Sequence, residues 1–400
     1  MKKYFLIVLM ALIAVSGSRF IHASQENVIK KNGLINILLD ISRRISYLNT
    51  FEAGSAEFLK GKRRLARKLR RAAGLAVNKS QKEYLNSLIP VAKREKLSSG
   101  SLPWGKKSIN EYDIFLFNTG KENKTFPVVI INESERTESA GKYFFMIKDA
   151  LDKGLLKKKV KYFPEENIFF ASKIKYPPDL NKEVLFYPRN RTGKNKYPRI
   201  FILTGKLESK FINKVAPAAK KLYKPKKAGL VNFETFFMNE IFHRISHFLA
   251  PVFVKVKDEE PVTADKKLKE LFFTMEEVRA GLNSLINILI LEEKGYFKEN
   301  IFERSLATYL AGIFAELGPG TIKNIPALIQ VNYFLDEGGI SVNIVKNRLK
   351  VDKEKLKKNI KHLYKLVSDL ESKGLYEDCR KFIAKYSEIN DSSEALINIF

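Results

Sequence analysis

The sequence predicts an α+β protein that is predominantly helical, with a small mixed β-sheet lobe between two helical stretches. Three observations lead to this fold class. Apolar residues follow a helical period from Val28 to about Leu97, short runs rich in Ile, Val, Phe and Tyr follow, and the helical period returns from Lys206 onward. Helices and half-buried strands space their apolar residues differently, by about 3.6 and 2 residues, so these shifts mark changes of structure.

The first 23 residues have the pattern of an export signal. Lys2 and Lys3 form a positive start, and residues 4–15 are an apolar run of twelve. Such a run is too short to cross a bilayer, which takes about 20 residues, but it suits a signal-peptide core. We therefore expect residues 1–23 to be a cleaved signal peptide and the mature chain to be periplasmic or secreted. An uncleaved N-terminal anchor is the alternative.

The composition indicates a folded, strongly basic protein. Hydrophobic residues make up 45% and charged residues 29% of the chain, as in globular proteins. The formal net charge is +28, and removing the three basic residues of the export signal leaves +25. This charge favours anionic partners such as a membrane or cell-envelope surface, although no motif predicts specific nucleic-acid recognition. Because Cys379 is the single cysteine, an internal disulfide is excluded.

The N-terminal helical region is expected over residues 24–110. Its most basic part, Lys60 to Arg71, contains eight Lys and Arg residues, and Leu65 and Leu69 lie one helical turn apart. A helix here places the leucines on one face and the charges on the others. Either it binds anionic lipid as an amphipathic helix, or it is a solvated helix packed through Leu65, Leu69 and Ala72. We favour the second interpretation.

Residues 111–205 are expected to form an α+β lobe with about five strands. The strand candidates are short β-branched and aromatic runs separated by Pro, Gly, Asn and Asp. They are Tyr112–Phe117, Val128–Ile131, Asn167–Ala171, Glu183–Tyr187 and Arg199–Leu203. A helix is expected among them, around Tyr143 to Leu156.

Residues 206–400 are expected to form a helical domain. Its clearest helix has an apolar stripe with alternating steps of four and three residues. The stripe comprises Leu356, Ile360, Leu363, Val367 and Leu370. Asp352 stands where a capping residue is expected, and Gly374 where the helix should stop.

Two of the four histidines are the strongest candidates for chemistry. His243 and His247 fall in a predicted helix over residues 233–247, and Glu240 shares their face. Residues four apart project from one side of a helix, so both imidazoles can reach one metal ion. Such a pair is weak evidence alone, and a purely structural role is an equal alternative. A second helical segment, residues 274–282, adds carboxylates, and two histidines with one carboxylate are a usual set for catalytic zinc.

These two segments resemble the motifs of the dipeptidyl-peptidase III family, especially its smaller bacterial relatives. The family has His-Glu-x-x-His on a helix after a phenylalanine-rich stretch, and then a helix with Glu-Glu-x-Lys/Arg-Ala-Asp/Glu. The resemblance runs from about Arg64 to the end of the chain, with further landmarks at Arg199–Gly205, Lys210–Pro217, Gln330–Gly339 and Val351–Tyr386. It implies that residues 206–400 form a metallopeptidase-like domain.

Carried over residue by residue, the resemblance makes His243, His247 and Glu277 the zinc ligands. In the family, the glutamate directly after the first histidine is the general base that takes a proton from zinc-bound water. This chain has Arg244 at that position. Arginine stays protonated in proteins and cannot act as the base.

Other departures from the family pattern remove further groups. Lys323 falls where the family has a histidine, and Gly281 falls where it has an acidic residue. The family's Gly-Pro-Tyr-Glu motif is not recognisable after Tyr112. Each departure removes a catalytic or supporting group.

Arg244 also bears on whether zinc binds. A unit charge about 5 Å from a divalent ion costs roughly 6–7 kcal/mol at an effective dielectric constant near 20, whereas structural zinc sites gain about 10–16 kcal/mol. Alternatively, Arg244 pairs with Glu277 or Glu240 and takes the place of the metal. The balance slightly favours a site that is metal-free or binds zinc weakly.

Three functions are open at this stage. The leading one is an exported dipeptidyl-peptidase III-like pseudoenzyme whose cleft still holds a peptide or another anionic ligand. The second is an active zinc hydrolase with Glu240 as a replacement base. The third is a basic protein that binds anionic membrane or cell-envelope surfaces through Lys60–Arg71. The sequence does not decide whether the protein is an enzyme, but the absence of the general base at position 244 argues against activity.

Overall fold

The computed structural model has the predicted fold class, a predominantly helical α+β protein with a small mixed sheet. Contacts divide the chain into two compact units, which are Met1–Thr137 with Glu166–Gly205, and Glu138–Glu165 with Lys206–Phe400. The structure describes residues 33–48, 50–51, 55–76, 79–93, 112–118, 125–132, 134–156, 168–175, 184–187, 199–249, 253–254, 262–297, 300–318, 324–343 and 348–399. The expected signal peptide, residues 1–23, and Lys323 lie outside these described residues.

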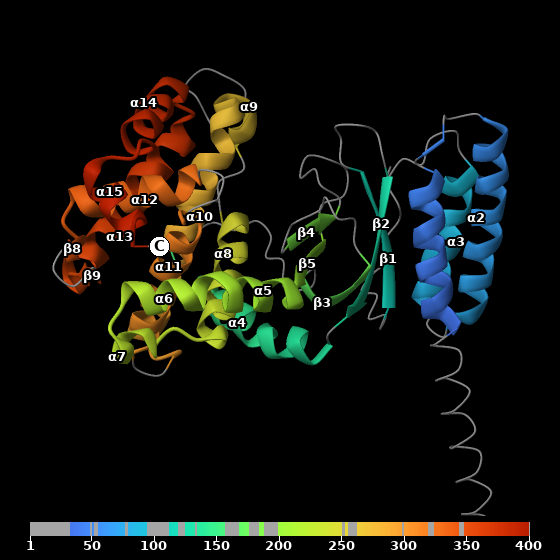
Figure 1. Ribbon diagram of the computed structural model, residues 1–400, viewed down its shortest axis with the longest axis horizontal. Helices are drawn as coiled ribbons and strands as arrows, with labels where there is room; N and C mark the ends of the chain where they lie inside the picture. Colours follow the sequence, from blue (N-terminus) through green and yellow to red (C-terminus); the bar gives the residue numbers. More distant parts are fainter. Residues whose placement is uncertain are drawn as a thin grey trace, which may run out of the picture. The chain divides into compact units, whose positions relative to one another are not determined.

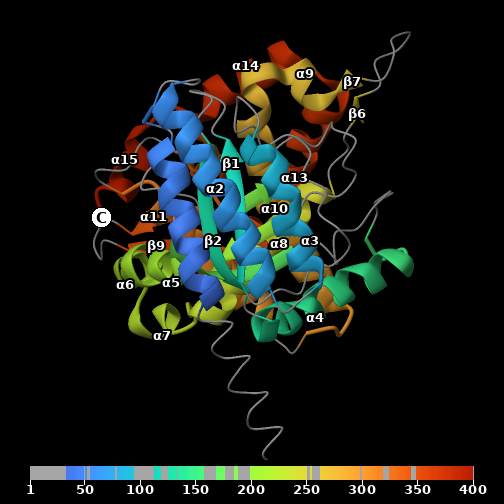
Figure 2. The ribbon, with the colours of Figure 1, turned by 90° about the vertical axis from the view of Figure 1, so that its right-hand side faces the viewer.

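Three helices in the first unit pack into a bundle around one apolar core. They are a helix over residues 33–48, α2 (Ala56–Leu75) and α3 (Lys79–Lys93), and they lie side by side in both views (Figure 1; Figure 2). Ser55 caps α2 by accepting a hydrogen bond from Phe58 N. Leu65, Leu69 and Ala72 are buried in the bundle core, so the apolar face of this basic helix is covered by the chain itself.

A five-stranded mixed sheet completes the first unit. Its strands are β1 (Tyr112–Asn118), β2 (Thr125–Asn132), β3 (Ile168–Lys175), β4 (Val184–Tyr187) and β5 (Arg199–Leu203). They are ordered β1-β2-β3-β5-β4, with β3 and β5 parallel and the other pairs antiparallel. Each strand candidate from the sequence overlaps one of these strands. The register of β2 on β3 shifts between Val129 and Ile130, as a β-bulge does.

The helix expected at residues 143–156 starts earlier and ends earlier than predicted. It is α4, Ser134–Asp152, and the chain leaves it at Gly154, which has a left-handed φ of 68°. Glycine adopts this conformation without strain, and it ends a helix. From residue 138, α4 belongs to the second unit, because Tyr143 packs on Phe242 and Phe297. The sequence had grouped this helix with the strands in residues 111–205.

The second unit is organised around α10 (Phe272–Glu293). This helix packs against α8 (Phe233–Phe248), α11 (Ile301–Ala315), α12 (Ile325–Asp336) and α13 (Lys353–Lys373). Most of its residues are buried, as expected of a helix that is apolar on nearly every side. Among the described helices, none has the length and apolar character that crossing a bilayer would need.

The long amphipathic helix predicted near the C-terminus is α13. The side chain of Asp352 accepts a hydrogen bond from Lys355 N at 3.1 Å, and Gly374 ends the helix with a φ of 62°. Four residues of the predicted stripe, Leu356, Ile360, Leu363 and Val367, are buried. The prediction of this helix and of both its ends is confirmed.

Shorter elements surround this core. They are α5 (Thr204–Lys210), a π-helical turn (Phe211–Val215), α6 (Ala216–Leu222), α7 (Pro225–Ala228), β6 (Phe253–Val254), β7 (Val262–Thr263), α9 (Ala264–Leu268), a 3-10 turn (Lys269–Leu271), β8 (Ile340–Asn343), β9 (Arg348–Val351), α14 (Tyr376–Tyr386) and α15 (Asp391–Ile397). Arg348 Nη1 donates to the backbone carbonyls of Lys221 and Tyr223, at 2.8 and 2.6 Å. This guanidinium satisfies carbonyls at the end of α6 and ties β9 to it.

Candidate metal centre

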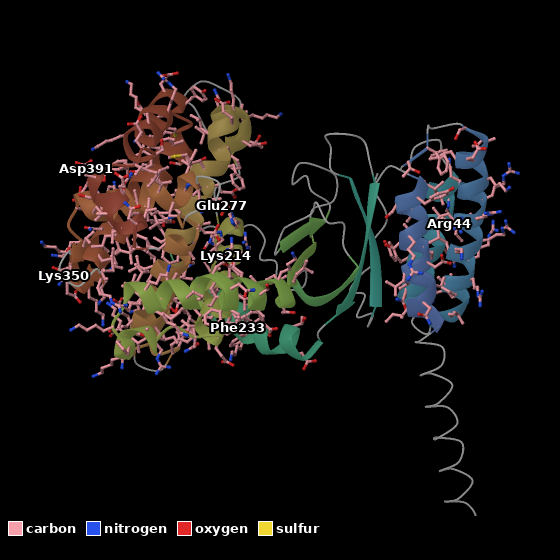
Figure 3. The ribbon with its side chains drawn as sticks, in the orientation of Figure 1. Arg44, Lys214, Phe233, Glu277, Lys350 and Asp391 are labelled. Carbon is pink, nitrogen blue, oxygen red and sulfur yellow. The ribbon has the colours of Figure 1, made fainter. Side chains whose placement is uncertain are left out.

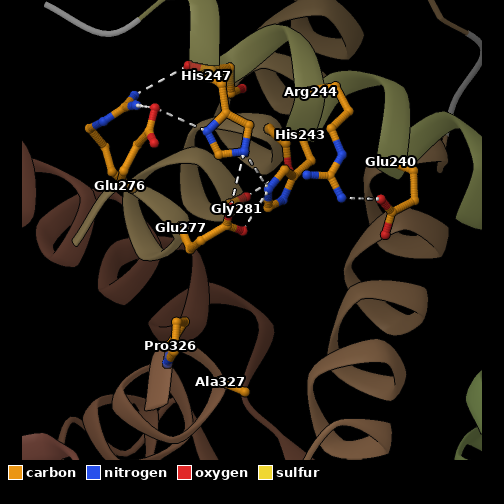
Figure 4. Close-up of polar contacts among 12 residues, drawn as sticks. Glu240, His243, Arg244, His247, Glu276, Glu277, Gly281, Pro326 and Ala327 are labelled. Atoms are coloured by element: carbon orange, nitrogen blue, oxygen red, sulfur yellow. Dashed lines mark hydrogen bonds and ion pairs between the residues drawn. The ribbon is translucent and has the colours of Figure 1, made fainter. Parts of the chain in front are cut away.

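α8 carries both histidines of the candidate centre. Its first turn is capped by Asn232, whose side-chain oxygen accepts a backbone hydrogen bond at 2.9 Å. Phe242 and Ile245 are fully buried, and their packing sets the rotation of the helix. As a result His243 and His247, one turn apart, both face α10 (Figure 4).

Side chains of three residues converge between α8 and α10. His243 Nε2 lies 3.0 Å from His247 Nε2 and 3.2 Å from Glu277 Oε2. His247 Nε2 lies 3.5 Å from Glu277 Oε1. Figure 4 shows the two rings and the carboxylate pointing toward one another. Among the described residues, these three form the single group of histidines, cysteines and carboxylates arranged closely enough to hold a metal ion.

The donor set fits zinc. Bonds of about 2.0–2.1 Å in tetrahedral geometry place ligand atoms roughly 3.3 Å apart. The two nitrogens are 3.0 Å apart, and each lies 3.2 or 3.5 Å from a different oxygen of Glu277, so the separations are close to that value. Two imidazoles and a carboxylate leave the fourth position to a water molecule. Burial lowers the pKa of His247 to about 4, although Glu276 and Glu277 oppose the shift. His247 is therefore neutral at pH 7, the form that binds metal.

Glu277 is held in its ionised form. Burial alone would raise its pKa, but the contact with His243 and the nearby charge of Arg244 bring the pKa far below its ordinary value. A carboxylate must be deprotonated to bind a metal ion. His247 of α8 and Glu277 of α10 are thus both in the protonation state that binds a metal ion.

A buried chain of charged groups lies behind His247. Its Nδ1 is 3.2 Å from Glu276 Oε1, and Arg279 Nη2 is 3.9 Å from the same oxygen. Arg279 Nε in turn lies 2.7 Å from Glu371 Oε2 of α13. The Arg279 side chain is 1% exposed and the Glu371 side chain 4%. A carboxylate on the second ring nitrogen of a metal-binding histidine fixes the orientation of the ring, so Glu276 leaves His247 Nε2 facing Glu277.

Arg244 pairs with Glu240 one turn earlier on α8. Arg244 Nη2 lies 3.2 Å from Glu240 Oε2, and their side chains are only 17% and 16% exposed. Burial opposes the ionisation of Glu240, yet Arg244, Lys210 and His243 hold the pKa of Glu240 below its ordinary value. Of the two partners that the sequence allowed for Arg244, the structure therefore selects Glu240. The three metal-binding candidates stay together.

The side chain of Tyr309 accounts for the glycine at position 281, although the sequence assigned this tyrosine no role. Gly281 lies one turn beyond Glu277 on the buried face of α10. A Cβ atom there would lie 2.4 Å from the hydroxyl oxygen of Tyr309, which comes from α11. The Tyr309 hydroxyl hydrogen-bonds to Gln330 Oε1, while Gln330 Nε2 donates to Pro326 O at 3.0 Å. The phenol group of Tyr309 thus occupies the space that a side chain at position 281 would need.

The sequence predicts some residues of this centre and not others. It named His243, His247, Glu277, Arg244 and Glu240, and the structure brings all five together, whereas Lys323 lies outside the described residues. It assigned no role to Glu276, Arg279, Tyr309 or Glu371. One available signal was the pair of opposite charges three residues apart, Glu276 and Arg279, in a helix whose remaining residues are mostly apolar. Tyr309 and Glu371 come from other helices and had no local signal.

Solved structures similar to this chain include two dipeptidyl-peptidase III proteins. That of Caldithrix abyssi matches with a TM-score of 0.71 and 20% identity, over 86% of this chain and 69% of the other. That of Corallococcus sp. strain EGB matches with a TM-score of 0.69 and 20% identity, over 86% and 66%. The fold is dipeptidyl-peptidase III-like. The resemblance stated from the sequence is confirmed at the level of the fold.

The sequence comparisons cover less of the chain than the structural ones. No family model matches the chain. Nudix hydrolase 3 of Arabidopsis thaliana is 24% identical over 198 residues, which are 49% of this chain and 26% of that protein. The chain therefore spans about a quarter of the length of this curated relative, and the likeness concerns only part of it.

Proposed function

We propose that this chain is an exported dipeptidyl-peptidase III-like protein that retains a zinc site but has lost efficient peptidase activity. His243, His247 and Glu277 would hold the ion. Bound zinc would polarise a carbonyl group or lower the pKa of a bound water molecule. The retained ligand would be a peptide or another anionic compound, in keeping with the basic charge of the chain.

The pairing of Arg244 with Glu240 is the observation that carries this proposal. Arg244 stands at the position of the expected general base and carries no basic lone pair at neutral pH. Glu240, the replacement candidate, is held at 3.2 Å by that same arginine, and its pKa is lowered. A general base works best with a pKa near the working pH. Neither residue therefore suits proton removal from water, although the ligand set is intact.

The geometry is also compatible with zinc retention. The metal-free alternative allows Arg244 to pair with Glu277 or with Glu240, and the observed partner is Glu240, so Glu277 stays with the two histidines. The guanidinium is engaged one turn earlier on α8, and the three ligand atoms remain within 4.8 Å of one another. The charge of Arg244 weakens binding through space, while its ion pair with Glu240 offsets part of that repulsion.

Zinc analysis and a peptidase assay on the same preparations test the proposal. We expect about one zinc ion per chain, the stoichiometry of a three-ligand site, and its loss in His243→Ala. We expect dipeptidyl-naphthylamide hydrolysis by the zinc-loaded chain no faster than by His243→Ala. Hydrolysis by the original chain that disappears in His243→Ala would overturn the loss of activity. Absence of zinc from both would overturn the retained site.

An active hydrolase is the second candidate, because Glu240 is ionised and lies within the electrostatic influence of His243. In that case Glu240→Gln would abolish hydrolysis, whereas Arg244→Ala would preserve or increase it by freeing the Glu240 carboxylate. If neither the original chain nor Arg244→Ala shows hydrolysis, this candidate is excluded.

A further inference from the structure

α2 carries a row of cationic side chains on one narrow face. This cationic row comprises Lys60, Arg63, Arg64, Arg67, Arg70 and Arg71, all of them exposed. The helix turns by about 100° per residue, so these spacings confine the row to an arc of roughly 120°. The rise of about 1.5 Å per residue makes the row roughly 17 Å long.

The opposite face of α2 fixes the direction in which the row points. Phe58, Leu65, Leu69 and Ala72 are at most 6% exposed and belong to the core of the three-helix bundle. Because these residues are held by the other two helices, α2 cannot rotate its charges inward. Figure 3 shows nitrogen-tipped side chains projecting from α2 away from the rest of its bundle.

Among the described residues, no carboxylate pairs with the cationic row. Residues 33–93 contain thirteen Lys and Arg and only four Asp and Glu, a net charge of +9. Asp40, a nearby acid, is engaged by Lys68. Within the described part of the chain, no ion pair joins a member of the row to a carboxylate. Like charges four residues apart, such as Arg63 and Arg67, repel each other and destabilise a helix, so an external anion would relieve this repulsion.

We propose that the cationic row docks the protein onto a membrane surface of anionic phospholipids. Five of its six members are arginines, whose planar forks match phosphate groups. Leu59, one turn before Arg63 at the edge of the row, is 43% exposed and can enter the interface between headgroups and acyl chains. The buried face of α2 stays in the bundle, so the attachment is electrostatic and reversible.

The same residues do not favour a single-stranded nucleic acid as the partner. Single strands are bound by exposed aromatic rings that stack on bases, and the aromatic residue of α2, Phe58, is buried. Duplex DNA attracts Lys and Arg through its phosphates without regard to sequence, so the experiment below compares it directly with the anionic vesicles. A uniformly cationic face without exposed aromatic rings suits a surface of anionic headgroups better than a single strand.

Vesicle co-sedimentation of the full chain tests this proposal, with phosphatidylglycerol and phosphatidylcholine in equal parts against phosphatidylcholine alone. We expect binding only to the anionic vesicles, with loss of binding at about 1 M salt, where the screening length falls to about 3 Å. The triple variant Arg63→Gln, Arg67→Gln and Arg70→Gln should bind about a hundred-fold more weakly, because each basic residue contributes about five-fold. Glutamine preserves helix propensity.

A matched variant removes the same charge elsewhere. Lys358→Gln, Lys361→Gln and Lys381→Gln change three exposed lysines of the second unit and should leave binding within a few-fold of the original. Equal losses in both variants would mean that only net charge matters and would overturn the proposal. Binding that survives in the arginine variant or at high salt would also overturn the proposal. The apolar run at residues 4–15 would produce binding of that kind. Tighter binding to duplex DNA than to the anionic vesicles would also overturn it.

Discussion

Gly281 lies in the interior of α10, where a glycine costs about 0.5–1 kcal/mol relative to alanine. Tyr309 makes the glycine necessary, since its hydroxyl oxygen would lie 2.4 Å from a Cβ atom at position 281. The hydroxyl cannot easily withdraw because it is hydrogen-bonded to Gln330, whose own amide is bound to Pro326 O. The departure from the family's acidic residue is therefore coupled to a residue on another helix.

We expect Gly281→Ala to destabilise the protein by about 1–3 kcal/mol, the usual cost of overpacking. In a Tyr309→Phe background the nearest atom is the ring carbon at 3.3 Å, so the same substitution should be close to neutral. Urea unfolding of the two single variants and the double variant gives the coupling energy.

Gly312→Ala serves as the control for this cycle. A Cβ atom at Gly312 on α11 would meet nothing within 4 Å, so the change should stabilise the chain by about 0.5–1 kcal/mol. A Gly281→Ala variant as stable as Gly312→Ala would show that Tyr309 does not restrict position 281.

At the scale of elements, the candidate centre depends on how three helices meet. α8 supplies the histidines, α10 supplies Glu277, and α13 reaches the centre through the pair of Arg279 and Glu371. Burying two charges is costly, and a buried pair is maintained only when each charge has its partner. Glu371 thus fixes Arg279, which lies against Glu276, and Glu276 faces His247.

We expect Arg279→Met to destabilise the protein by about 3–5 kcal/mol, because it leaves Glu371 buried without its counter-charge. Adding Glu371→Met should recover most of this loss, since the pair is then replaced by apolar side chains. Chemical denaturation of the single and double variants measures both effects.

The exposed pair of Arg380 and Glu377 provides a matched comparison. Arg380 Nη2 lies 2.8 Å from Glu377 Oε2, but the two side chains are 60% and 61% exposed. Arg380→Met should therefore cost less than about 1 kcal/mol. If Arg279→Met and Arg380→Met lowered the free energy of unfolding by similar amounts, burial would not determine how much each ion pair contributes.

For the whole molecule, the division into two compact units separates the two features with functional interest. The candidate metal centre lies wholly in the second unit, and the cationic row lies wholly in the first. Each feature rests on its own core, the α10 packing in one case and the three-helix bundle in the other. The two proposals can therefore fail or succeed independently.

Zinc should raise the thermal stability of the unit that holds the centre. At about 1,000 times the dissociation constant, a ligand adds roughly 4 kcal/mol, which corresponds to about 10 °C for a unit of this size. Differential scanning calorimetry with zinc and then with excess chelator measures the shift. We expect His243→Ala to show none, whereas the triple arginine variant of α2 should retain it. A shift of equal size in His243→Ala would place the zinc elsewhere.

The sequence by itself determined several elements of this protein and, for some of them, the face that each presents. Period and capping residues placed α13 between Asp352 and Gly374, and helical spacing put His243 and His247 on one side of α8, because these properties depend on neighbours within a few residues. Only the tertiary structure decided that Arg244 turns to Glu240, that Tyr309 fills the space beside Gly281 and that Glu371 balances Arg279. Most of these choices depend on distances between helices far apart along the chain, and local spacing does not encode such distances.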